Sequence, residues 1–123
     1  MRLFSLSVLA SIMSLIFVEN ASAHAYPVQE TPEAGAVLAA APRMVSITFT
    51  EGVNAHFSGI IVTNKTGQRV DDGDVVRDKN NHEILSVGIK QGGLPAGVYK
   101  VIWHALSSDG HRTKGSYEFT ESK

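Results

Sequence analysis

Short stretches in which apolar and polar residues alternate are the strongest constraint on the fold of this chain. Within residues 44–51, Val45, Ile47 and Phe49 fall on one side, and serine and threonine fall on the other. The same alternation recurs in residues 85–89, 98–106 and 116–120. Because successive side chains of an extended strand point to opposite faces, each stretch predicts a strand with one buried face.

The remaining segments fit around these strands. Residues 57–64 predict a further strand, and a turn at residues 64–67 leads into a short extended piece at 68–70. Residues 25–42 contain three prolines and predict an irregular or edge strand with at most one or two helical turns. Residues 71–82 are rich in Asp, Asn, Lys and Gly, so we expect a solvated connection without core residues and at most a weak strand at Val75-Val76. About seven short strands predict an all-β fold, an antiparallel β-sandwich of the Ig-like kind with Greek-key links.

The first 23 residues have the pattern of a secretory signal peptide. Arg2 precedes an apolar run that is shorter than the about 20 residues needed to span a bilayer, and Ala21-Ser22-Ala23 has the small-x-small form of a cleavage site. Cleavage there would leave residues 24–123 as one exported domain that begins at His24. A second frame, Ala23-His24-Ala25, would instead leave Tyr26 first.

Charge and cysteine content narrow the range of partners. The formal net charge is −1, and loss of Arg2 and Glu19 with the signal would leave it at −1. Such a balance offers no basic stripe for nucleic acid and no polybasic patch for lipid, so a small ligand or ion is the expected partner of a monomer. The chain has no cysteine, which excludes disulfides and thiolate metal sites and leaves packing to stabilise the fold.

The sequence Ser107-Ser108-Asp109-Gly110-His111 follows the longest alternating stretch and resembles half of a metal site. Asp109 and His111 can point to the same side, but two ligands seldom hold a transition metal alone. Spacing alone favours a polar turn, and His24 is the candidate that would complete a site. His104 lies near the loop and is interpreted as a surface imidazole, His56 and His82 are placed in polar loops, and Trp103 is assigned to the core.

Several short motifs occur in a set order along the chain. They are His24 at the mature start, Phe49-Thr50-Glu51, Phe57-Ser58-Gly59, residues 94–103 with the sequence LPAGVYKVIW, Ser107-Ser108-Asp109-Gly110-His111 and Gly115. As an ordered set they resemble the CopC family of periplasmic copper-binding proteins. The resemblance implies a cupredoxin-like sandwich that carries Cu(II), one ion per chain, on His24, Asp109 and His111, with Glu51 as a supporting or weak axial group. It also suggests an inner-membrane copper transporter of the CopD type as partner. Residues 60–87 lack the methionines that form a Cu(I) site in some members.

The donors in this set have a clear preference among metals. A free α-amine and Nδ1 of the same histidine close a chelate ring, and His111 with an Asp109 oxygen can complete a roughly square N,N,N,O set that suits Cu(II) better than Zn(II). The expected function is therefore non-enzymatic periplasmic sequestration or delivery of Cu(II) in copper homeostasis and resistance. Two alternatives stay open, a histidine-brace copper oxidase or monooxygenase and a metal-free Ig-like exported domain.

Overall fold

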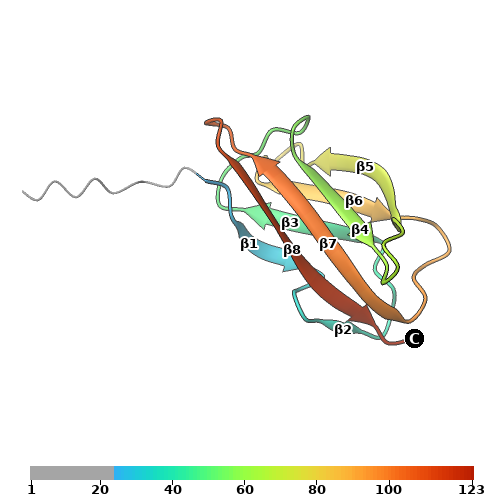
Figure 1. The fold of residues 1–123 in the computed structure, drawn as a ribbon. Coiled ribbons are helices and arrows are strands. Elements are labelled where there is room, and N and C mark those ends of the chain that lie inside the picture. The colour runs from blue at the N-terminus through green and yellow to red at the C-terminus, as the bar shows by residue number, and fades with distance from the viewer. Residues whose placement is uncertain (1–23) are drawn as a thin grey trace, which may run out of the picture.

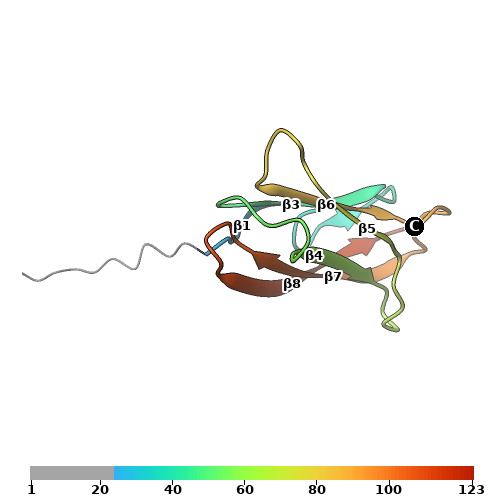
Figure 2. The same cartoon turned by 90° about the horizontal axis from the view of Figure 1, so that it is seen from above.

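The computed structural model describes residues 24–123, which form two four-stranded sheets packed face to face. The first sheet has the order β1 (Pro27–Thr31), β3 (Met44–Phe49), β6 (Ile84–Ile89) and β5 (Asp71–Arg77). The second has the order β2 (Val37–Leu38), β8 (Arg112–Glu121), β7 (Gly97–Leu106) and β4 (Gly59–Thr63). Figure 1 shows the second sheet in front of the first, and Figure 2 shows the two layers from above. The predicted β-sandwich is confirmed, and the signal-peptide prediction lies outside the described residues.

The core lies between the sheets and is built by the alternating strands. In β7 the buried side chains are those of Tyr99, Val101, Trp103 and Ala105, as the alternation predicts. From the opposite sheet, Val45, Ile47 and Phe49 of β3 and Leu85 and Val87 of β6 are buried against them. The ring of Trp103 meets Phe49 edge-on at a centroid distance of 5.4 Å. One continuous apolar core therefore holds the two sheets together.

The strand connections give the sandwich its Greek-key character, with one pair that the sequence did not predict. The chain changes sheets at every connection except two, because β5 with β6 and β7 with β8 form antiparallel pairs within one sheet. The two-residue strand β2 pairs with β8 in parallel, with Val37 opposite Thr120. The sandwich is thus antiparallel except at this edge.

Strand β5 corrects the expectation that residues 71–82 form a solvated connection without core residues. Asp71 is buried at the start of β5, and Val75 packs against the core. The carboxylate of Asp71 accepts hydrogen bonds from the N–H groups of Val62 and Gly73, and it pairs with Arg69 at 2.6 Å. Because these partners replace water, an acidic residue can begin a strand at the edge of the core.

The proline-rich segment before β3 contains edge strands, as predicted, but no helical turn. Strand β1 begins at Pro27 and shifts its register against β3 between Pro27 and Gln29. The alanine-rich residues 34–41 contain only β2 and turns. Within residues 24–123, no helix is long and apolar enough to cross a membrane.

Candidate metal centre

The N-terminal arm, defined here as residues 24–26, lies against the end of the sandwich where β3 finishes. The arm and the turn between β7 and β8 lie at the same end of the molecule in both views (Figures 1 and 2). Ala25 is completely buried, whereas His24 is partly exposed. The Tyr26 carbonyl accepts a hydrogen bond of 2.8 Å from the backbone N–H of Thr50, the residue after β3. The arm is therefore part of the fold, and it fixes where His24 can reach.

The histidine loop, residues 107–111, connects β7 to β8 and is organised by one buried hydroxyl. Ser107 is the next residue in the alternating series of buried side chains of β7, and it is 2% exposed. Its Oγ donates to Asp109 Oδ1 and accepts the His111 N–H at 3.1 Å. Gly110 adopts a φ of 93°, which a residue with a Cβ rarely does, and its N–H bonds the Ser107 carbonyl at 2.9 Å. The loop is thus a tight turn that presents Asp109 and His111 together.

The carboxylate of Asp109 is held in its charged form by its neighbours. The hydrogen bond from Ser107 lowers the pKa of Asp109 below its ordinary value, partial desolvation opposes this, and His111 lowers it further. The distance from Asp109 Oδ1 to His111 Nδ1 is 3.2 Å. The Asp109 carboxylate therefore lies next to Nδ1 of His111 and not next to Nε2.

The two histidines from opposite ends of the sequence meet here. The ring centroids of His24 and His111 lie 4.8 Å apart with an interplanar angle of 36°. His24 Nδ1 also lies 3.2 Å from the Tyr26 hydroxyl. His24, Asp109 and His111 are therefore brought together, although among residues 24–123 no three His, Cys, Asp or Glu side chains are close enough to form a ready metal site. The side-chain donors must rotate before they can share one ion.

The other candidate residues lie around this centre in different ways. Glu51 is half-buried between Thr50, which bonds the arm, and Gly52, whose carbonyl accepts hydrogen bonds from Ser108. The His104 ring lies on the outer face of β7, where a Cβ on Gly59 would come within 2.6 Å of its Cε1. His56 and His82 are exposed in loops. The backbone of His82 nevertheless contacts the segment before β4, because its carbonyl accepts the Val53 N–H at 3.0 Å.

Three hydroxyl residues touch this centre, and the sequence analysis gave none of them a role of its own. Thr50 and Thr113 bond the arm, and Ser107 bonds the loop. The alternation in β7 could have predicted that Ser107 is buried, since every second residue from Tyr99 onward is buried. Thr50 follows the same alternation on the polar face of β3 and carries no distinguishing signal.

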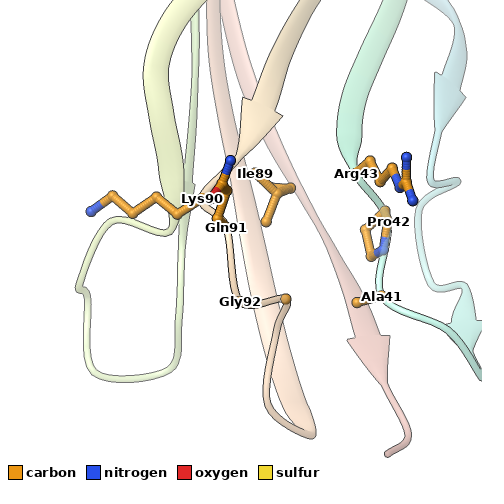
Figure 3. A pocket seen from close by; sticks show the side chains of 8 residues that line it. Ala41, Pro42, Arg43, Ile89, Lys90, Gln91 and Gly92 are labelled. Atoms are coloured by element: carbon orange, nitrogen blue, oxygen red, sulfur yellow. The ribbon is translucent and has the colours of Figure 1, made fainter.

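A cavity of about 470 Å³ lies at the opposite end of the first sheet and contains none of these residues. It opens between residues 41–43, which precede β3, and residues 89–93, which follow β6. Figure 3 shows the side chains of Arg43 and Lys90 extending away from it to opposite sides. The two charged side chains that line this cavity therefore do not point into it.

Fold and site together define a small β-sandwich in which an N-terminal imidazole and a loop imidazole meet at one end. Comparison with known families assigns it further, because the CopC domain matches residues 27–122. The chain belongs to the CopC family.

Named relatives and solved structures agree with this assignment. The copper transport protein CutJ of Bacillus subtilis strain 168 is 39% identical over 91% of this chain, which spans only 21% of CutJ. The crystal structure of CopC from Methylosinus trichosporium OB3b is 33% identical with a TM-score of 0.74, over 80% of this chain and 94% of that one. PcoC, a methionine-rich copper resistance protein from Escherichia coli, is 30% identical with a TM-score of 0.69, over 80% of this chain and 99% of its own.

Proposed function

We propose that the mature chain begins at His24 and binds one Cu(II) ion through the α-amine and imidazole of His24, a carboxylate oxygen of Asp109 and the imidazole of His111. The observation that carries this proposal is the 4.8 Å separation of the His24 and His111 rings, which belong to segments at opposite ends of the sequence. The CopC family and the copper-related names of the relatives support copper as the metal.

The donor set favours Cu(II) for chemical reasons. The α-amine is not a side chain, so it would add a nitrogen to the two imidazoles, and rotation of Asp109 would add an oxygen. Three nitrogens and one oxygen in a plane suit Cu(II), which also stands above Ni(II) and Zn(II) in affinity for such ligands. Copper on His24 Nδ1 would replace the hydrogen bond that the Tyr26 hydroxyl makes there. Glu51, the residue after Thr50, is proposed as a supporting or weak axial group.

The arm supports cleavage before His24 rather than before Tyr26. Removal of residues 24 and 25 would delete Ala25, a completely buried member of the core. It would also remove the carbonyl acceptors of His24 and Ala25, which the hydroxyls of Thr50 and Thr113 use. A chain that begins at His24 keeps these contacts and frees the amine.

The proposed role is sequestration or delivery of Cu(II) in the periplasm by a monomer, without catalysis. The names of the relatives refer to copper transport and copper resistance, which fits a binding role. A membrane copper transporter of the CopD type is the proposed receiver. An oxygen-activating enzyme would show reductant-driven peroxide formation above that of free copper. We expect none, since the Asp109 carboxylate would fill a position on the metal that such an enzyme keeps open.

The test is a Cu(II) competition titration on protein exported with its own leader and shown by mass spectrometry to begin at His24. His111→Ala and Asp109→Ala should each weaken Cu(II) binding by at least about tenfold, because each removes a donor. His56→Ala and His82→Ala are the matched controls and should stay near wild type, and Glu51→Gln should have a smaller effect than His111→Ala. Equal losses at His82 and His111 would show that the site is elsewhere.

A further inference from the structure

Two threonine hydroxyls bond the N-terminal arm, in addition to the backbone hydrogen bond at Tyr26 and the burial of Ala25. We propose that Thr50 is a positioning residue for the copper site, because its hydroxyl holds the arm so that His24 stays beside His111. This inference rests on the proposed copper-binding function, and it assigns Thr50 a role without making it a ligand.

Thr50 contacts the arm on both sides of Ala25. Its hydroxyl accepts the backbone N–H of Tyr26 at 3.1 Å and donates to the carbonyl of His24 at 3.1 Å. Its own backbone N–H donates to the Tyr26 carbonyl at 2.8 Å. A hydroxyl can donate and accept at the same time, and the branched Cβ of threonine restricts its χ1 rotamers. One side chain thus fixes the backbone of His24 and Tyr26 together.

The sequence of β1 explains why a side chain is needed at this point. Pro27 has no N–H to donate, and the register between β1 and β3 shifts between Pro27 and Gln29. The strand ladder is therefore interrupted just where the chain turns toward His24. The hydroxyl of Thr50 supplies contacts that a regular ladder would otherwise provide.

A second threonine ties the arm to the strand that carries the histidine loop. Thr113 Oγ1 donates to the Ala25 carbonyl at 2.7 Å, and Thr113 lies in β8, two residues after His111. The arm is thus bonded to the first sheet through Thr50 and to the second sheet through Thr113. Its position relative to the histidine loop is set by both contacts.

Positioning matters because the two halves of the site come from different segments. The amine and Nδ1 of His24 belong to one residue, so their chelate ring survives any movement of the arm. The His24 donors can share an ion with Asp109 and His111 only while the arm stays against the sandwich. If the arm is freed, the effective concentration of the His24 donors near the histidine loop falls. Loss of the Thr50 hydroxyl should therefore uncouple the halves without abolishing the His24 chelate.

The experiment compares Thr50→Val, Thr50→Ser and the control Thr48→Val, which lies in β3 opposite Gln29. All are exported from the full chain and verified to begin at His24. Thr50→Val should lower Cu(II) affinity about tenfold, the equivalent of one or two lost hydrogen bonds, and should change the Cu(II) EPR spectrum. Thr50→Ser should restore both, and Thr48→Val should leave both unchanged. Without copper, hydrogen exchange at the Tyr26 amide should accelerate only in Thr50→Val.

The outcomes separate this inference from the proposed function. If Cu(II) affinity depends on His111 but is unchanged in Thr50→Val, with the same EPR spectrum, the role of Thr50 is wrong and the proposed function stands. If His111→Ala binds Cu(II) as tightly as the wild type, the proposed function fails, and the role of Thr50 in copper binding fails with it. A loss in Thr50→Val that Thr50→Ser does not restore would also overturn the hydroxyl contact as the cause.

Discussion

At the scale of single residues, Asp71 shows how this fold contains a buried charge. Burial alone would raise the pKa of Asp71, but the hydrogen bond from Arg69, the N–H groups of Val62 and Gly73 and the Arg69 charge outweigh it and hold the pKa below its ordinary value. Because Val62 is in β4 and Asp71 begins β5, the carboxylate also fastens the crossover between the sheets. Protonation of Asp71 in acid should therefore weaken the contact between β4 and β5, which belong to different sheets.

Asp71→Asn should destabilise the protein at neutral pH more than in acid. A carboxyl group whose pKa is lower in the folded chain stabilises the fold above its unfolded pKa of about 3.9, and this contribution is lost as the pH falls through the folded value. We expect the unfolding free energy at pH 7 to fall by about 2 kcal/mol in the variant. The difference from wild type should shrink below about pH 4. Urea titrations at pH 7 and pH 3 measure this, and an equal difference at both would contradict it.

Ser107→Ala should weaken copper binding although serine is not a proposed ligand. The buried hydroxyl bonds both the Asp109 carboxylate and the His111 N–H, so its loss lets the histidine loop relax. We expect a loss of about 1 kcal/mol in unfolding free energy and several-fold weaker Cu(II) binding. Ser116→Ala, on the exposed side of β8, is the control for both readouts. Unchanged Cu(II) affinity in Ser107→Ala would show that the loop needs no such support.

At the scale of elements, the N-terminal arm is the segment whose chemistry depends on processing. An α-amine has an unperturbed pKa of about 7.7–8.0, so copper must displace a proton at neutral pH, and affinity should rise with pH until the amine is free. One extra residue before His24, or its acetylation, should lower Cu(II) affinity by orders of magnitude and leave the fold intact.

A Met-extended chain made without the leader is compared with the processed protein by Cu(II) titration and circular dichroism. Equal affinity and equal copper spectra for both proteins would exclude the amine as a ligand. Asp109 and His111 would then have to use another third donor.

Strands differ in how far the sequence reveals them. In β3 and β7, alternation is decisive because each strand has one face on the core and one in water. Strand β5 was expected only as a weak strand at Val75-Val76, because the acidic residues and glycine around it look solvated. Only the tertiary partners of Asp71 make its burial possible. Strand β2 pairs through only two residues, in parallel, which is too short for any periodic pattern.

At the scale of the whole molecule, copper oxidation state should follow the distribution of donors. If the mature chain begins at His24, as proposed, Met44 is its only methionine. Met44 begins β3 and is half exposed, whereas the arm contacts Thr50 beyond the other end of this strand. Soft Cu(I) prefers thioether ligands, so we expect tight Cu(II) binding and poor Cu(I) binding. A competition titration with a chromogenic Cu(I) chelator measures this. Tight one-to-one Cu(I) binding would refute it.

The stability of the whole molecule should not depend on redox conditions. The chain has no cysteine, so the continuous core between the sheets stabilises it without cross-links. Thermal unfolding of metal-free protein should give the same midpoint with and without a thiol reductant. A midpoint that shifts with reductant would contradict this prediction.

The candidate site was predicted from resemblance more than from spacing. Asp-x-His in a loop is compatible with an ordinary polar turn, and no sequence pattern relates His24 to His111, which only the packing of the arm brings together. The hydroxyl contacts of Thr50 and Thr113 depend on that packing as well. Single-residue patterns cannot reveal them, because each contact joins segments that are distant in sequence.

The length of β8 has a practical consequence for handling the protein. This strand runs for ten residues from Arg112, next to the histidine loop, to Glu121, a span of about 33 Å. In Figure 1 the C-terminus lies at the end of the molecule away from the arm. A dye, affinity tag or surface anchor attached after Lys123 should therefore leave the histidine end open to solution. The same attachment at His24 would occupy the amine itself.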